Sequence, residues 1–167
     1  MADSLEMRVG QALRAQRLTL ALAESCTGGL IGHRLTNVPG SSDYFLGGIV
    51  AYAYEAKERL LGVHHQTLYQ HGAVSRETAI EMARGARLAL GADIGLSVTG
   101  IAGPTGGLPD KPVGLTWIAI STRDEEHAKQ HLWPGDRDEN KALSAEAGLQ
   151  MLLASLERDG PPKLSKT

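Results

Sequence analysis

The stretch Leu18–Gly29 constrains the fold of this chain more than any other. It opens with a run of apolar and β-tolerant residues, Leu18 to Ala23, whose length is typical of a buried strand in a parallel sheet. The run ends at a small and polar cluster that contains Ser25, and apolar residues recur at helical spacing from Leu30 onward. The sequence therefore predicts a strand, a tight turn and a helix. Ser25 is then expected at the carboxyl edge of a sheet, where α/β proteins bind ligands, beside the free amides that begin a helix.

Strands and helices are predicted to alternate along the rest of the chain. Further strands are predicted at 45–52, 94–98, 113–121 and 128–133, and helices at 4–16, 30–38, 55–61, 76–90 and 137–156. Residues 64–72 are expected to form a polar connection, and residues 159–167 a disordered tail. The alternation predicts one domain over residues 1–158 of the α/β class: a three-layer α/β/α sandwich around a mixed, mostly parallel sheet.

Composition excludes several classes of protein. The net charge of −2 indicates no basic surface for binding nucleic acid. The sequence contains no run of 18 apolar residues, so no membrane-spanning helix is expected. The single cysteine, Cys26, rules out an internal disulfide framework, and the cytoplasm is the expected compartment. The six histidines have no metal-ligand spacing, so no metal site is expected.

Four polar or glycine-rich clusters could converge on a single cleft at one edge of the sheet: 24–29, 41–42, 52–57 and 99–107. A serine there becomes a nucleophile only if a base takes its proton, and neither an Asp–His pair nor a G-x-S-x-G elbow accompanies Ser25. Lys57 is the remaining candidate base, if burial near Leu60 and Leu61 lowers its pKa. The alternatives are that Ser25 only caps a helix and that Lys57 is a solvated helix residue.

Two nucleotide chemistries are disfavoured. Tyr52 and Lys57 are one residue too far apart for the Tyr-x-x-x-Lys pair of short-chain dehydrogenases, and no G-x-G-x-x-G fingerprint is present. The turn at 100–107 lacks the Gly-Lys-Ser/Thr ending of a phosphate-binding loop. Hydride transfer and nucleoside triphosphate hydrolysis therefore lose support.

Taken together, these segments resemble the CinA C-terminal domain family, the nicotinamide-nucleotide amidohydrolases. The matching stretches cover roughly residues 5–155 in family order: Ala23-Glu24-Ser25-Cys26-Thr27-Gly28-Gly29, Pro39-Gly40-Ser41-Ser42, Tyr52 with Glu55-Ala56-Lys57, His71-Gly72-Ala73-Val74-Ser75, Thr99 to Gly107, Lys111-Pro112-Val113-Gly114 and Gly135-Asp136-Arg137. Three residues depart from the family pattern. Ala53-Tyr54 stand where Ser-Asn is frequent, and Trp133 stands where Phe is usual.

The resemblance implies a deamidase of nicotinamide mononucleotide that forms nicotinate mononucleotide and ammonia in pyridine-nucleotide salvage. It implies a catalytic pair of Ser25 and Lys57, assisted by Tyr52, with no metal or organic cofactor. It also implies a homodimer. Larger CinA proteins carry a separate pyrophosphatase domain, whose activity is not transferred to this chain.

Substrate binding is expected from residues in the same clusters. Amides of residues 26–29, or near Gly103, are expected to hold the oxyanion, and Ser42 and Arg137 the phosphate. Thr99 and Thr105 are candidates for positioning the ribose or the ring. The full set of expected binding residues is Glu24, Thr27, Gly28, Gly29, Ser42, Thr99, Gly103, Thr105 and Arg137.

Two other functions are compatible with the same residues. Cys26 lies next to Ser25 and would be the stronger nucleophile, although a free cysteine is usually a small buried residue. Alternatively, the domain is a regulatory module that binds a nucleotide without turnover, in which case Lys57 would not be needed.

Overall fold

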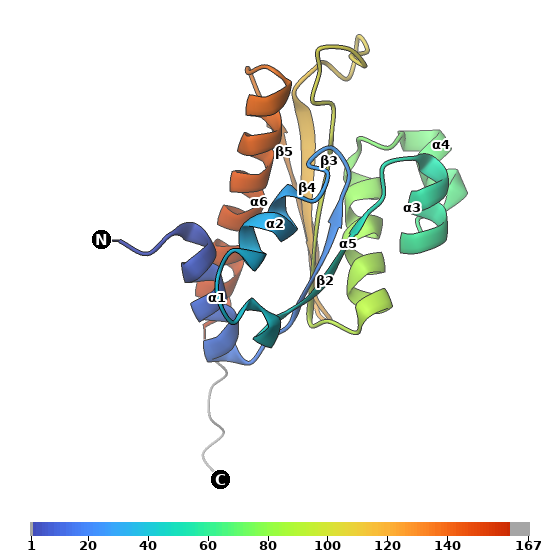
Figure 1. The fold of residues 1–167 in the computed structure, drawn as a ribbon. Helices are drawn as coiled ribbons and strands as arrows, with labels where there is room; N and C mark the ends of the chain where they lie inside the picture. Colours follow the sequence, from blue (N-terminus) through green and yellow to red (C-terminus); the bar gives the residue numbers. More distant parts are fainter. Residues whose placement is uncertain (1, 161–167) are drawn as a thin grey trace.

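A five-stranded sheet separates two layers of helices in the computed structural model, which describes residues 2–160 (Figure 1). The strands are β1 (Leu20–Glu24), β2 (Phe45–Val50), β3 (Ile94–Gly100), β4 (Leu115–Ser121) and β5 (Glu126–Leu132), in the spatial order β2-β1-β3-β4-β5. Strands β2, β1 and β3 are parallel neighbours, and β4 and β5 continue the sheet with antiparallel pairings. The predicted α/β sandwich with a mixed sheet is confirmed.

The helices divide evenly between the two faces of the sheet. One face is covered by α1 (Leu5–Gln16), α2 (Leu30–Thr36) and α6 (Arg137–Asp159). The other face is covered by α3 (Tyr54–Leu61), α4 (His65–His71) and α5 (Arg76–Leu90). A single 3₁₀ turn, η1 (Ser41–Asp43), precedes β2.

Two sequence-based boundaries need correction. The predicted polar connection 64–72 contains helix α4, whose single buried side chain, Leu68, leaves too little apolar periodicity to reveal it. Helix α6 continues to Asp159, so the tail predicted at 159–167 begins too early, and residues 161–167 lie outside the described part.

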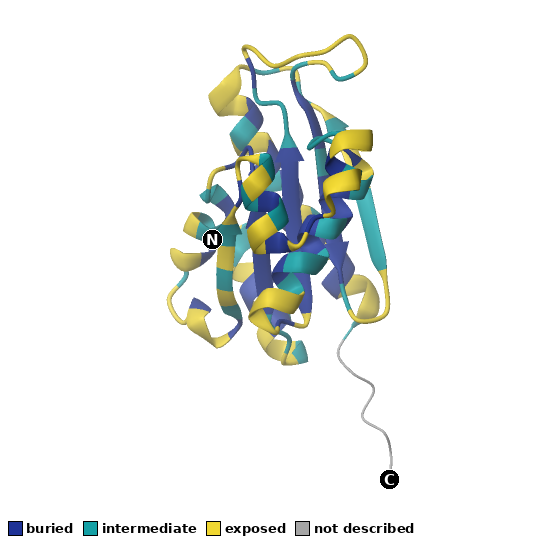
Figure 2. Cartoon of the chain, turned by 90° about the vertical axis from the view of Figure 1, so that its right-hand side faces the viewer, coloured by how far each residue is buried: buried dark blue, intermediate teal, exposed yellow. Residues whose placement is uncertain are grey.

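Strand β1 lies at the centre of the core, and its two faces are built differently. Leu20 and Leu22 pack in the cluster formed with α1, α2 and α6, whereas Ala21 and Ala23 face the α5 side. The small residues let α5 approach the sheet closely: a Cβ on Gly95 would lie 2.0 Å from the carbonyl oxygen of Ala83. Figure 2 shows the resulting buried sheet behind the more exposed helices.

The parallel strands bring three chain segments to one edge of the sheet. Glu24, at the end of β1, is paired with Val50 of β2 and with Val98 of β3. The residues that follow these strands are therefore neighbours, although they are far apart in sequence. Within residues 2–160, no helix is both long and apolar enough to cross a membrane.

Candidate active site

Ser25 and Lys57 are in contact at the carboxyl edge of β1 and β2. Lys57 Nζ lies 3.0 Å from Ser25 Oγ, 2.9 Å from the carbonyl oxygen of Ala51 and 3.0 Å from that of Tyr52. The Lys57 residue is only 1% exposed, and Ser25 is also buried. The solvated-lysine alternative is therefore wrong for Lys57.

The fold fixes both partners through the main chain. The amide of Ser25 donates to Val98 O in β3, which holds the serine directly beyond the end of β1. The amide of Ala51 donates to Glu24 O, which fixes the end of β2 beside it. Helix α3 begins three residues after Ala51 and places Lys57 in its first turn. The Lys57 side chain points back at the strand ends.

Burial lowers the pKa of Lys57 to about 8. Leu61 is buried as the sequence suggested, but Leu60 is 54% exposed and does not shield the amine. The neutral amine has two N–H donors, which the carbonyls of Ala51 and Tyr52 can accept. Its lone pair then faces the Ser25 hydroxyl, which is the geometry that a base needs.

The lowered pKa predicts a pH-dependent contribution to stability that a Lys57→Met variant should lack. Between pH 8 and 10.5 the unfolded chain keeps this amine protonated while the folded protein does not, so the unfolded state binds more protons. The free energy of unfolding of the native protein should therefore rise relative to the variant, by roughly 2–3 kcal/mol across that window. Denaturant unfolding of both proteins at about pH 7.5 and about pH 10 measures this difference. A difference that is the same at both pH values would contradict the lowered pKa.

Glu24 holds the turn together and does not face the cleft. Its carboxylate is buried and accepts hydrogen bonds from the Thr27 hydroxyl at 2.6 Å and from the amides of Ile31 at 3.0 Å and Gly32 at 3.1 Å. The side chains of Glu24 and Thr27, which the sequence analysis assigned to substrate binding, are therefore used within the turn.

The main chain of the same turn offers free donors beside Ser25. Within residues 2–160, the amides of Cys26 and Thr27 donate no hydrogen bond to another residue, whereas the Gly28 amide donates to Ser25 O. Gly28 and Gly29 have φ values of +62° and +100°, which side-chain-bearing residues rarely adopt. These glycines allow the turn to present its amides next to the Ser25 hydroxyl.

Cys26 is a poor candidate for the nucleophile. Its side chain packs in the apolar core beside α2 and α6, and burial raises the pKa of its thiol to about 12. The reactive thiolate is thus scarce at neutral pH. The buried-residue alternative for Cys26 is the one that the structure supports.

Arg137 connects two other expected site residues. Its Nη1 donates to the carbonyl oxygen of Gly103 at 2.7 Å, and its Nη2 donates to the Tyr52 hydroxyl at 3.0 Å. The Tyr52 phenol is therefore turned toward Arg137, and only the Tyr52 carbonyl contacts Lys57. A cavity of about 520 Å³ adjoins this arginine and is lined by Ala102, Pro104, Val113, Gly135, Asp136, Arg137 and Asp138.

The remaining expected residues are not all at this site. The Thr99 hydroxyl is buried and donates to Ala73 O at 2.8 Å, while Thr105 is exposed in the long loop between β3 and β4. Ser42 lies in η1, at the end of β2 opposite to Tyr52, so it cannot meet Arg137 within one chain. Ser42 precedes β2 and Tyr52 follows it, so the length of the strand separates the two residues. The motif Pro39-Gly40-Ser41-Ser42 does not reveal this separation.

Sequence reasoning missed two groups that shape the site. The carbonyl of Ala51 is one, and a main-chain acceptor leaves no trace in a sequence. The other is Asn140, whose side-chain amide donates to Ala102 O at 3.0 Å and fixes the start of the β3–β4 loop. Its burial is visible only in the structure, because in the sequence Asn140 stands among charged residues at the start of a helix. In the described part of the chain, no three His, Cys, Asp or Glu side chains group as metal ligands do.

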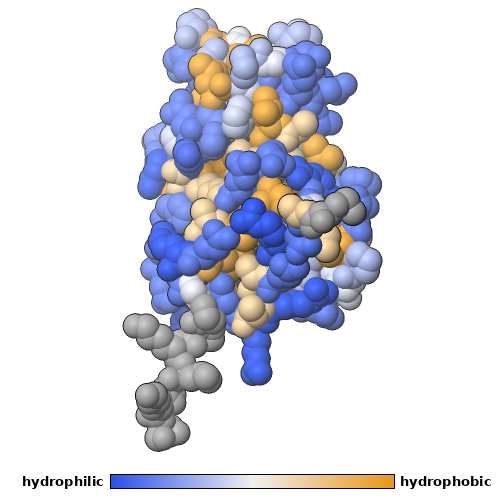
Figure 3. All heavy atoms as spheres, turned by 90° about the vertical axis from the view of Figure 1, so that its left-hand side faces the viewer, coloured by the Kyte–Doolittle hydropathy of each residue, from blue (hydrophilic) through white to orange (hydrophobic). Residues whose placement is uncertain are grey.

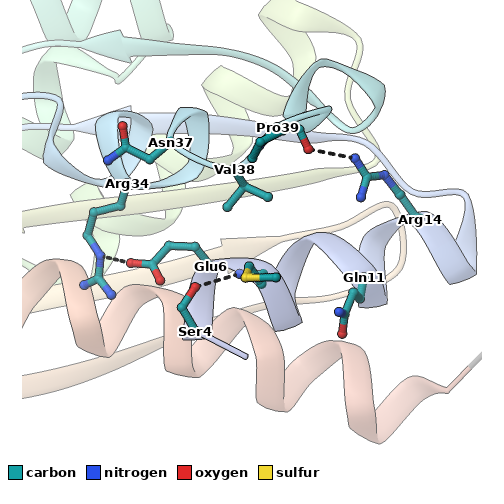
Figure 4. Close-up of a pocket in the computed structure, with 9 residues that line it drawn as sticks. Ser4, Glu6, Gln11, Arg14, Arg34, Asn37, Val38 and Pro39 are labelled. Carbon is teal, nitrogen blue, oxygen red and sulfur yellow. Dashed lines mark hydrogen bonds and ion pairs between the residues drawn. The ribbon is translucent and has the colours of Figure 1, made fainter. Parts of the chain in front are cut away.

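A separate cavity of about 430 Å³ lies between α1 and α2 (Figure 4), and Ser25 is not among the residues that line it. Its two arginines are already paired: Arg34 with Glu6 and Glu146, and Arg14 with Asp43. On the surrounding face of the molecule, apolar side chains lie scattered among hydrophilic ones (Figure 3). This cavity offers neither a nucleophile nor an unpaired charge.

The fold and the site define an α/β protein with a buried serine–lysine pair at the carboxyl edge of its parallel strands. The chain belongs to the CinA family, because residues 2–156 match the model of the CinA C-terminal domain. This finding confirms the family resemblance read from the sequence.

Individual relatives agree with this assignment. A CinA-like protein of Salinibacter ruber is 56% identical over 147 residues, which are 88% of this chain and 36% of that protein. The crystal structure of competence damage-inducible protein A from Klebsiella pneumoniae has a TM-score of 0.89 at 35% identity, covering 92% of this chain and 95% of that one. The competence/damage inducible protein CihA of Agrobacterium tumefaciens has a TM-score of 0.83 at 38% identity, covering 94% and 98%. The chain thus spans just over a third of the length of the curated relative and nearly all of the solved ones.

Proposed function

We propose that this domain hydrolyses the carboxamide of nicotinamide mononucleotide, giving nicotinate mononucleotide and ammonia. The observation that carries the proposal is the 3.0 Å contact between Ser25 Oγ and a buried Lys57 amine whose pKa is lowered to about 8. Membership in the CinA family supports the choice of a pyridine nucleotide.

The first half of the reaction acylates Ser25. Lys57 Nζ takes the hydroxyl proton while Ser25 Oγ attacks the carboxamide carbon. The free amides of Cys26 and Thr27 are the candidates to stabilise the oxyanion. When the tetrahedral intermediate collapses, the carbon–nitrogen bond breaks and Lys57 returns the proton to the leaving nitrogen, which departs as ammonia.

The second half restores the enzyme. A water molecule gives one proton to Lys57 and attacks the ester carbon. When the bond to Ser25 Oγ breaks, Lys57 returns that proton to Ser25 Oγ, and the carboxylic acid is released. The amine form of Lys57 must be present at the start of both halves. The rate is therefore expected to rise with pH toward the lysine pKa of about 8 and then to level off.

Arg137 is proposed to hold the substrate phosphate. Two of its N–H groups bind Gly103 O and the Tyr52 hydroxyl, which leaves three donors on a guanidinium that borders the 520 Å³ cavity. Its contacts with segments that follow β2 and β3 fix the guanidinium in place before a ligand arrives.

Ammonia release from purified protein tests the function and its substrate preference. Losing one charged hydrogen bond costs roughly 1.5–3 kcal/mol, so kcat/KM on free nicotinamide should be about tenfold to a hundredfold below that on the mononucleotide. Arg137→Ala should remove most of this preference. Arg123→Ala, at an exposed arginine in the β4–β5 turn, is the matched control and should keep it.

Two outcomes would contradict the proposal in different ways. Equal efficiency on both compounds would exclude recognition of the phosphate. Folded protein that releases no ammonia from the mononucleotide, but binds it, would support the regulatory module instead.

A further inference from the structure

The cavity beside Arg137 is bounded by two segments that are far apart in sequence. One wall belongs to the loop between β3 and β4, residues 101–114, and the other wall to residues 135–138 at the start of α6. Within residues 2–160, no main-chain hydrogen bond joins residues 102–104 to residues 135–138. The separation of the two walls therefore depends on side chains.

Asn140 joins the two walls with one side chain. It lies one turn into α6 and is only 2% exposed. Its Nδ2 donates to the carbonyl oxygen of Ala102 at 3.0 Å, and its Oδ1 accepts from the amide of Gly135 at 3.0 Å. A primary amide carries a donor and an acceptor side by side, and both are used here, one on each wall. We call this pair of hydrogen bonds the Asn140 bridge.

The start of α6 holds Asn140 itself in place. Its main-chain amide donates to Asp136 O at 2.8 Å, and a capping box between Asp136 and Glu139 fixes the first turn of the helix. Gly135 packs tightly against this turn, because a Cβ on Gly135 would lie 2.6 Å from Glu139 Cβ. The helix-side wall is thus well fixed, and the Asn140 bridge attaches the β3–β4 loop to it.

The bridge reaches Arg137 through one peptide unit. Ala102, whose carbonyl Asn140 binds, directly precedes Gly103, whose carbonyl accepts from Arg137 Nη1 at 2.7 Å. Gly103 has a φ of +89°, and glycine is the least restricted residue, so its carbonyl needs neighbours to fix it. The other partner of the guanidinium is the hydroxyl of Tyr52, a residue that is 59% exposed. The orientation of Arg137 therefore depends on the Asn140 bridge.

We propose that Asn140 is a positioning residue for phosphate recognition, an inference that rests on the proposed function. The bridge holds the cavity at one width and keeps the Arg137 guanidinium fixed at its border. Asn140 is not among the residues that line the cavity, so it acts through Ala102 and Gly103 rather than by touching the ligand. A group that is fixed before binding loses less freedom when the ligand arrives, which strengthens binding. Loss of the bridge should therefore weaken phosphate binding and leave the chemistry at Ser25 unchanged.

Steady-state kinetics of Asn140→Asp test this role. Aspartate has nearly the size of asparagine and keeps an acceptor for the Gly135 amide, but when ionised it cannot donate to Ala102 O. KM for nicotinamide mononucleotide should rise about tenfold, while kcat stays within about twofold of the native value. The kcat/KM on free nicotinamide, which has no phosphate, should not change. Asn140→Leu, which loses both hydrogen bonds, should give the same pattern with a larger rise in KM.

Ser97→Ala is the matched control for a merely structural role. The Ser97 hydroxyl is buried in β3 and donates to Ala79 O at 2.6 Å, on the α5 side of the sheet. Its removal also takes a buried side-chain donor from a main-chain carbonyl, so Tm should fall in this variant as in the Asn140 variants. Only the Asn140 variants should raise KM.

Amide hydrogen exchange of the ligand-free protein tests the bridge without an activity assay. In Asn140→Leu the Gly135 amide loses its acceptor, and the amides of Ile101 and Gly114, which close the base of the β3–β4 loop, should open more often. All three should exchange at least about fivefold faster than in the native protein, and Ser97→Ala should leave them unchanged.

The outcomes separate this proposal from the proposed function. Unchanged exchange at the three amides, a native KM in both Asn140 variants, or an equal loss on free nicotinamide would overturn the role of Asn140. A native protein that releases no ammonia from either compound would contradict the proposed function alone. The dissociation constant of the mononucleotide would then replace KM as the measurement, with the same tenfold rise expected in Asn140→Asp.

Discussion

Replacing Lys57 with arginine is expected to lower kcat/KM for nicotinamide mononucleotide on the order of a thousandfold or more. A guanidinium stays protonated at any pH that the protein tolerates, so it cannot take the proton from Ser25. It would also place a permanent charge where the buried Lys57 amine contacts two carbonyls and one hydroxyl. Ser25→Ala and Lys57→Ala should each cause a loss of similar size.

The double variant Ser25→Ala/Lys57→Ala separates a catalytic unit from two independent contributions. Residues that act as one unit lose activity together, so the double variant should be scarcely slower than either single variant. Lys129→Arg, on the exposed edge strand β5, controls for the change of side chain and should keep native activity. Circular dichroism checks that every variant is folded. A folded Lys57→Arg variant with near-native turnover would leave Ser25 without a base.

Glu24→Ala should be the most destabilising of the substitutions considered. It leaves the Thr27 hydroxyl and the amides of Ile31 and Gly32 without their acceptor in a buried turn. Each buried donor left unpaired costs about 1–3 kcal/mol, so the free energy of unfolding should fall by roughly 3–5 kcal/mol. For a domain of this size, Tm should drop by about 10 °C or more.

Thermal unfolding measures this loss of stability, and two further variants serve as comparisons. Thr27→Val removes one of the three hydrogen bonds and should cost only about 1 kcal/mol. Glu55→Ala, at an exposed glutamate of α3, controls for the loss of a carboxylate. A Glu24→Ala variant with native Tm and a raised KM would instead return Glu24 to the substrate site.

The contact between Ser25 and Lys57 could be anticipated because both residues follow buried strands. Two apolar runs, at 18–23 and 45–52, predict parallel strands whose ends are neighbours, and the register of β1 with β2 places them so. What the pattern could not supply is the direction of each side chain beyond the strand. Glu24 and Ser25 are adjacent, yet one points into the start of α2 and the other toward Lys57.

Three other expected site residues do not reach the Ser25–Lys57 pair with their side chains, for related reasons. The Tyr52 phenol contacts Arg137 rather than Lys57, because the chain turns between β2 and α3 and only the Tyr52 carbonyl faces the amine. Ser42 precedes β2, which puts the length of the strand between it and the site. Thr99 is the last but one residue of β3, and its hydroxyl is used by Ala73 O.

Because Cys26 is buried in the turn beside Ser25, the reactivity of its thiol depends on how often that turn opens. A thiol reagent needs an accessible thiolate, and this side chain is 6% exposed with its pKa raised to about 12. The chain has no other cysteine. The labelling rate of the native protein therefore measures how often the turn opens. A nucleotide that holds the turn closed would lower this labelling rate in proportion to the fraction of sites it occupies.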